Sequence, residues 1–180
     1  MRFSKFLTVG LLGLGLASPA LSASLSDALV KLDEINALRE SLASTLDPKR
    51  ETISEETFKR VCAPVGLALK SWAQENGIEA RQISDRFRNP LHEAKGRDLS
   101  ILREFKKNPE RTHVVEERIV AGVPGWQLYR RIVVRESCLH CHGHQGSRPE
   151  FIKSKYPQDK AHSFKAGDLR GLYSVWLKKD

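Results

Sequence analysis

Apolar residues recur every three or four positions along residues 24–50. The members of this stripe are Leu25, Ala28, Leu29, Leu32, Ile35, Leu38 and Leu42. Because an α-helix has 3.6 residues per turn, this spacing predicts a long N-terminal amphipathic helix with one apolar face. We expect that face to pack on the rest of the protein. Pairing of two copies through it, which would make a homodimer, is the alternative.

A second stripe at helical spacing runs through residues 53–77. It consists of Phe58, Val61, Val65, Leu69 and Trp72. Gly77 is a plausible end for this helix. Pro64 has no backbone N–H and cannot continue a helix, so we expect either a kink near Cys62 or a new helix that starts there.

Beyond Gly77 the pattern changes to short β-rich runs. The predicted elements are a strand at 78–84, a turn at 87–93, a helix at 97–108, strands at 112–120 and 126–134 joined by AGVPG at 121–125, and a closing strand at 171–179. Gly and Pro between two β-rich runs indicate a hairpin. Helices followed by antiparallel strands predict an α+β fold, with the helices on one side of a sheet.

The N-terminus has the form of a secretory signal peptide. Arg2 and Lys5 are followed by the apolar run at 6–16, which is about half the length needed to span a bilayer. Small residues follow at Ala20, Ser22 and Ala23. This order predicts export, cleavage near residues 22–23, no stable membrane insertion and, in a Gram-negative cell, a periplasmic location. A membrane anchor is the alternative.

Length and charge restrict the remaining possibilities. The 180 residues, 40% of them hydrophobic, suit one globular domain, so we divide the chain into signal peptide (1–23), N-terminal helix (24–50) and main domain (51–180). The formal net charge is +8, of which Arg2 and Lys5 supply two, leaving +6 on the mature chain. Export argues against a nucleic-acid partner. A basic surface could steer an acidic redox partner, or simply be solvated.

The stretch ESCLHCHGHQG at 136–146 carries the candidate chemistry. It contains Cys138 and Cys141, which are separated by two residues, and His142 directly after them. This is the arrangement for covalent haem c: two thiols form thioethers with the two vinyl groups, and the imidazole reaches the iron. Haem c is attached outside the cytoplasm, so the signal peptide supports this interpretation independently.

Three other interpretations of the stretch remain open. Zinc or copper could use the two cysteines with two of His140, His142, His144 and His162, although no second spaced ligand pair is present. A thiol-disulfide oxidoreductase would need a surrounding thioredoxin-like βαβ pattern, which is absent from the sequence. A structural disulfide within the motif would close a small, strained loop.

Haem attachment leaves Cys62 unaccounted for. It could be the second axial ligand, where a thiolate would lower the reduction potential by stabilising ferric iron. It could equally be a small buried hydrophobe, since it lies beside Phe58, Val65 and Leu69. The residues alone favour the buried role. His92, His113 and His144 are rival sixth ligands, and an open sixth position is also possible.

Four blocks, in order, carry a family resemblance. They are VCAPVGLAL at 61–69, RNP at 88–90, CLHCHG at 138–143, and YPQDKA at 156–161 with GDLRGLYSVW at 167–176. The chain resembles the exported monohaem c-type cytochromes with a PAS-like fold. Related domains form the sensor part of histidine kinases and chemoreceptors.

The resemblance implies a PAS-like antiparallel sheet with flanking helices and one covalent haem c. It implies His142 as proximal iron ligand and Cys62 as distal ligand, which reverses the preference drawn from the residues alone. Arg88 and Arg170 are candidates to pair with the haem propionates, and the alternative for both is a purely structural role. The chain departs from the family where His92 replaces an expected asparagine. It departs again at HSF, 162–164, which replaces a glycine-containing stretch.

The function expected from these features is electron transfer or redox or small-gas sensing, not enzymatic turnover. Iron held by both His142 and Cys62 would have no vacant site for a substrate. Any signal would pass to a separate, unidentified redox or signalling protein. The alternatives are a peroxidase-like haem enzyme with an open distal site and a metal-binding protein without haem.

Overall fold

The computed structural model describes residues 23–47 and 52–179. The predicted signal peptide therefore lies outside the described residues, apart from Ala23. The segment 48–51, where the N-terminal helix was expected to end, also lies outside them. Within the described parts, no helix is both long and apolar enough to cross a membrane.

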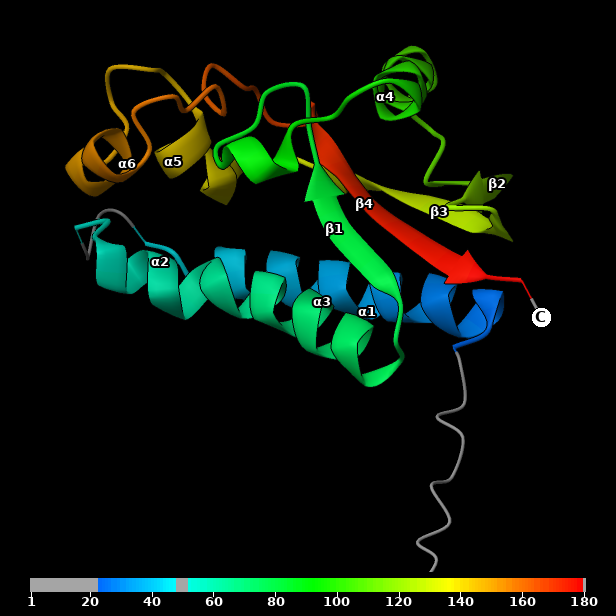
Figure 1. The fold of residues 1–180 in the computed structure, drawn as a ribbon. Coiled ribbons are helices and arrows are strands. Elements are labelled where there is room, and N and C mark those ends of the chain that lie inside the picture. The colour runs from blue at the N-terminus through cyan, green and yellow to red at the C-terminus, as the bar shows by residue number, and fades with distance from the viewer. Residues whose placement is uncertain (1–22, 48–51, 180) are drawn as a thin grey trace, which may run out of the picture.

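A four-stranded antiparallel sheet forms the centre of the molecule (Figure 1). Its strands are β1 (Glu79–Ile83), β2 (His113–Val120), β3 (Val123–Val133) and β4 (Leu169–Lys178), in the order β1-β4-β3-β2. The two longest strands, β3 and β4, pair at the centre, with an irregularity between Ile132 and Val133. The closing strand thus joins the hairpin to the strand that follows the helices.

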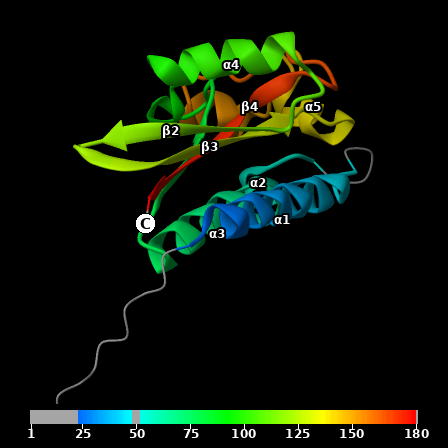
Figure 2. The ribbon, with the colours of Figure 1, turned by 90° about the vertical axis from the view of Figure 1, so that its right-hand side faces the viewer.

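Helices cover both faces of this sheet (Figure 2). On one side lie α1 (Leu25–Ser44), α2 (Glu55–Val61) and α3 (Ala63–Glu75), and on the other lies α4 (Arg97–Lys107). The α+β, PAS-like class is confirmed, but the expectation of helices on a single side is wrong. The reason lies in β3: Leu128 and Ile132 pack with α1 and α3, whereas Tyr129 packs with α4.

The N-terminal helix packs on the domain, as its apolar stripe predicts. Ala28, Leu32 and Ile35 are buried against α3 and the sheet. Leu38 is an exception, since it is exposed, and the polar Asn36 takes a buried position beside Ile35. The helix starts at a capping box in which Ser24 and Asp27 satisfy each other's backbone N–H groups.

Pro64 produces a fresh helix start. α2 ends at Val61, α3 begins at Ala63, and Cys62 lies between them. A proline in the first turn of a helix leaves no helical hydrogen bond unmade, because the first N–H groups have no partner there in any case. The break lets the chain present Cys62 outside a regular helix.

The β2–β3 turn is tighter than the sequence predicts. Ala121 and Gly122 alone connect the strands, with φ of 50° and 80°. The expected five-residue connection is therefore wrong, because the last three of its residues belong to β3. Gly125 marks a close approach instead of a turn: a side chain there would collide with the Trp176 ring and the Leu177 carbonyl.

Short elements close one end of the molecule. They are the 3₁₀ turns η1 (Pro90–His92) and η2 (Glu136–Cys138) and the helices α5 (Leu139–His142) and α6 (Glu150–Lys155). In Figure 1, α5 and α6 lie above α2, beyond the end of the sheet. This end of the molecule contains the candidate site.

Candidate functional site

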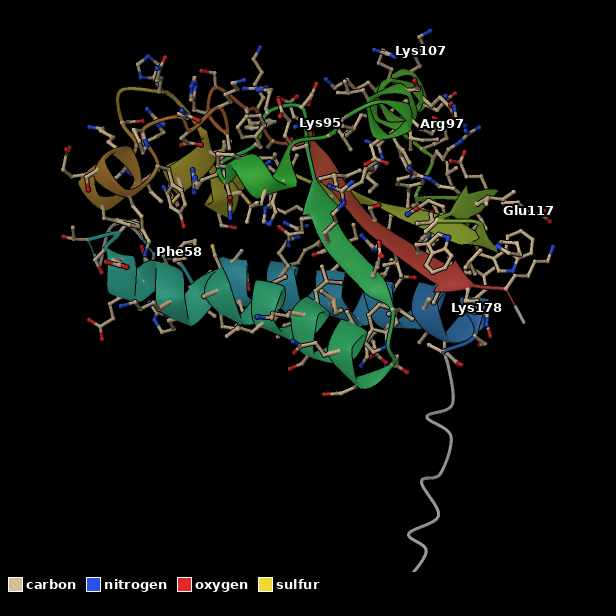
Figure 3. All side chains as sticks on the ribbon, viewed as in Figure 1. Phe58, Lys95, Arg97, Lys107, Glu117 and Lys178 are labelled. Carbon is tan, nitrogen blue, oxygen red and sulfur yellow. The ribbon has the colours of Figure 1, made fainter. Side chains whose placement is uncertain are left out.

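A cavity of about 280 Å³ lies where α1, the α2–α3 junction, η1 and α5 meet. Its wall contains Cys62, His92, Cys138, Cys141 and His142, together with Arg39, Arg88 and Arg170. The structure thus brings together all the haem-site residues that the sequence and the resemblance selected, although these lie in separate parts of the chain: Cys62, Arg88, Cys138, Cys141, His142 and Arg170. Phe58, which rises from α2 toward α6, lines the same cavity and stacks at a tilt on Phe151, with 6.1 Å between ring centroids (Figure 3).

The CxxCH residues occupy η2 and the single turn of α5. Residues three and four apart on a helical turn share a face, so Cys138, Cys141 and His142 project toward the same space. The turn is closed by the Gly143 N–H, which donates to the Leu139 carbonyl at 2.7 Å. Gly143 is required there, since a side chain would run into that carbonyl.

A carbonyl oxygen fixes the chemical form of His142. Its Nδ1 lies 2.7 Å from the Ala161 oxygen, which can only accept, so Nδ1 carries the proton and Nε2 keeps a free lone pair. Arg88 lies 3.4 Å from the same Nδ1 and cannot donate to it in this tautomer. Burial, with Arg170 and Arg88 nearby, holds the pKa of His142 well below its usual range. The imidazole is therefore neutral and in the form that binds metals.

Cys62 faces the cavity and is accessible there. The role of a buried core residue, favoured by the residues alone, is therefore wrong. Burial by the surrounding wall raises the pKa of the thiol, while Arg88 and Arg39 act in the opposite direction. Cys62, Cys138 and Cys141 are all free thiols.

Arg88 connects the CxxCH turn to a buried carboxylate. It donates to the Cys141 carbonyl at 2.7 Å and lies 3.4 Å from Asp159, whose side chain is fully buried. Asp159 also pairs with Arg148 at 2.6 Å and accepts from the Ala161 N–H at 2.8 Å. Arg88 and Asp159 thus hold the CxxCH turn and the Ala161 carbonyl in place together. Of the two roles considered for Arg88, the contacts support the structural one.

Arg170 is placed differently. Its guanidinium lies in the cavity wall and donates to the Arg86 carbonyl at 3.1 Å. Among the described residues it has no carboxylate at ion-pair distance. Burial and the neighbouring Arg88 lower its pKa to about 10. A partly buried cation without a counter-ion suits a ligand that carries carboxylates.

Arg39 also lines the cavity, although no sequence motif selected it. It reaches in from α1, with Nη1 3.8 Å from the Cys138 sulfur and Nη2 3.1 Å from Glu40. The available sequence signal was weak: Arg39 lies one helical turn after Asn36, on the inner side of an amphipathic helix. Asp159 was also missed, because its charged partners Arg88 and Arg148 are distant in the sequence.

Of the three rival histidine ligands, one lines the cavity and two lie elsewhere. His92 lines the cavity, whereas His113 lies against α1, 3.3 Å from Asp33. His144 is exposed and accepts from the Gly146 N–H. In residues 23–47 and 52–179, no three His, Cys, Asp or Glu side chains are grouped so that they could hold a metal ion by themselves.

Comparison with known proteins places the chain in a family. The family model described as Tll0287-like matches residues 17–177. The chain belongs to the Tll0287-like family. The crystal structure of the cyanobacterial haem protein Tll0287 is similar, with 37% identity, a TM-score of 0.77, and coverage of 87% of this chain and 95% of that one. No curated protein matches. The resemblance drawn from the sequence blocks is thereby confirmed.

The residues of the cavity fit a haem. Two thiols lie on one helical turn, a neutral imidazole has a free Nε2, and a thiol on another element could supply a second axial ligand. The unpaired Arg170 could compensate the charge of a propionate. A single metal ion would use only some of these groups. A haem would use all of them, through its vinyl groups, its iron and its propionates.

Proposed function

We propose that the chain is an exported, periplasmic monohaem c-type cytochrome. Cys138 and Cys141 would add across the two vinyl groups as thioethers, and His142 and Cys62 would hold the iron from two different elements. The observation that carries the proposal is the hydrogen bond from His142 Nδ1 to the Ala161 carbonyl, beside the two thiols. It leaves Nε2 of His142 free to bind iron. A haem protein at 37% identity supports it.

The role we propose is electron transfer or the sensing of redox state or small gases, not enzymatic turnover. Haem c, once bound, supplies one-electron chemistry. The chain's part is to hold His142 neutral, to place a cation at Arg170 and to exclude water with the apolar wall around Phe58. Iron held by both His142 and Cys62 would have no position left for a substrate. The electron or signal would pass to a separate protein partner.

Absorption spectra of the purified exported protein, oxidised and reduced, with and without carbon monoxide, test this role. A carrier gives low-spin spectra that carbon monoxide does not change. A sensor gives low-spin spectra in which carbon monoxide displaces the distal ligand. High-spin, five-coordinate iron with peroxide turnover would contradict the proposal in favour of a haem enzyme.

The same spectra test the role of His142 when His140 is used as the control. His142→Ala should remove the proximal ligand and change the spin state. His140→Ala, two positions away and outside the cavity wall, should leave the spectra as in the wild type. Equal effects of both changes would show that His142 has no special part.

Export is tested by the N-terminal sequence of the purified protein. Cleavage near residues 22–23 gives a chain that begins at Ala23 or Ser24. A periplasmic fraction that contains the uncleaved Met1 terminus would indicate an anchor and not a signal peptide.

A further inference from the structure

His92, one of the rival sixth ligands considered from the sequence, lies in the cavity wall and has no part in the proposed function. Its backbone is fixed to the end of β1, since the Ser84 N–H donates to the His92 carbonyl at 2.9 Å and the Ala94 N–H donates to Ser84 at 3.0 Å. The residue itself lines the cavity. The turn therefore holds this residue at the cavity by a defined backbone and not by a loose loop.

The ring of His92 is unpartnered. In the described part of the chain it makes no hydrogen bond and no ion pair, whereas four other histidines do: His113, His142, His144 and His162. The His140 ring also has none there, but of the two only His92 lines the cavity. The half-buried His92 ring is therefore free to bind a group placed in the cavity. Burial, with Arg170 and Arg81 nearby, lowers the pKa of His92 and keeps the ring in its neutral, ligating form.

Cys62 and His92 face the same cavity from different elements. Cys62 comes from the α2–α3 junction and His92 from η1, which Figure 1 places above those helices. Each is a donor that iron accepts, one through sulfur and one through nitrogen. The cavity thus offers two candidates for one distal position.

We propose that His92 is an alternative distal ligand that competes with Cys62 for the iron of the bound haem. This inference rests on the proposed haem c function. The exchange breaks one iron–sulfur bond and forms one iron–nitrogen bond. The released thiolate takes one proton from solvent, and no electron is transferred. The distal ligand changes from anionic sulfur to neutral nitrogen, which favours the reduced iron and raises the reduction potential.

Optical and electron paramagnetic resonance spectra of four proteins show whether Cys62 or His92 binds the iron. The four are wild type, Cys62→Ala, His92→Ala and the double variant. Cys62→Ala should remain low-spin but lose the thiolate signature, because the imidazole takes the position. The double variant should become high-spin. His92→Ala should keep the thiolate spectrum. Leu91→Ala, on the same turn with 79% of its surface exposed, is the matched control and should behave as wild type.

Two outcomes overturn the inference. A high-spin Cys62→Ala protein would show that His92 does not reach the iron and instead bonds another part of the ligand. A wild-type protein without a thiolate signature, unchanged by Cys62→Ala, would show that there is no competition.

Haem staining of the same samples on a denaturing gel separates these failures from failure of the proposed function. Wild type without stain contradicts the haem c proposal itself. Should the double variant fail to fold by circular dichroism, free imidazole added to Cys62→Ala decides the question. A position already held by His92 gives no spin change, whereas a vacant one converts from high-spin to low-spin.

Discussion

Asp159 shows how a residue outside the cavity can determine its chemistry. Its carboxylate accepts from the Ala161 N–H, and the Ala161 carbonyl in turn fixes the His142 tautomer. Arg88 and Arg148 compensate its charge from two sides. Burial pushes the pKa of Asp159 up, but the two guanidinium groups and the Ala161 N–H hold it below its usual range.

Asp159→Asn should therefore destabilise the protein by about 3 kcal/mol near pH 7, because it leaves two buried cations with one partner fewer. A carboxyl whose pKa is lower in the folded state stabilises above the unfolded pKa, here 3.8. That contribution is lost as the pH falls through the folded value. Urea unfolding at several pH values measures both effects.

The control for Asp159 is Glu117→Gln, at the far end of the hairpin (Figure 3). Glu117 is an exposed partner of Lys179, so its loss should change the free energy of unfolding by less than about 1 kcal/mol. Similar losses for both variants would contradict the role assigned to Asp159.

Arg170 should tune the iron electrostatically. A positive charge close to the haem favours the additional electron, so Arg170→Gln should lower the reduction potential measured by redox titration. Arg97→Gln removes the same charge on α4, where Arg97 pairs with exposed Glu104 and with Glu116, and should leave the potential unchanged. A potential unaffected by Arg170→Gln would place that guanidinium away from the haem.

At this scale the sequence predicted the local motif and little beyond it. Cys138, Cys141 and His142 follow from a spacing that is readable in five residues. Cys62 required the family resemblance, because its helical stripe alone placed it in the core. Arg39 reaches the Cys138 sulfur, and Asp159 pairs with Arg88 and Arg148, across more than ten positions of the chain, and the sequence has no local signal for such contacts.

Among the elements, the prediction was accurate where the pattern is local. The stripes of α1 and α3, the proline break and the strands β1 and β4 follow from periodicity and backbone chemistry. The β2–β3 turn was misplaced because Gly125 was interpreted as a turn residue, whereas it makes room for Trp176 on a neighbouring strand. Which face of the sheet α4 covers depends on tertiary packing, which the sequence does not show.

The two-residue turn carries removable strain at Ala121. Its φ of 50° places an ordinary side chain in the left-handed region, which costs about 1–2 kcal/mol. Ala121→Gly should raise the free energy of unfolding by about 1 kcal/mol. Gly122→Ala, at φ 80°, should lower it by a similar amount. Chemical denaturation of the two variants checks the pair, and equal signs would contradict this turn geometry.

The site exists only in the complete fold. Its residues come from α1, the α2–α3 junction, η1, α5 and β4, which meet beyond one end of the sheet. A haem held there links all five elements, so loading should stabilise the folded state. The Cys138→Ala/Cys141→Ala protein, which cannot attach haem, should melt at a lower temperature than wild type. His140→Ala should melt as wild type does, and no difference between the double variant and wild type would contradict the link.

The intact mass of the purified, denatured protein shows whether haem is covalently attached, because denaturation removes everything that is not covalently bound. Covalent attachment through Cys138 and Cys141 should give the mature chain plus the mass of one haem, and the bare chain for Cys138→Ala/Cys141→Ala. A wild-type mass equal to that of the polypeptide alone, from cells that mature c-type cytochromes, would contradict it.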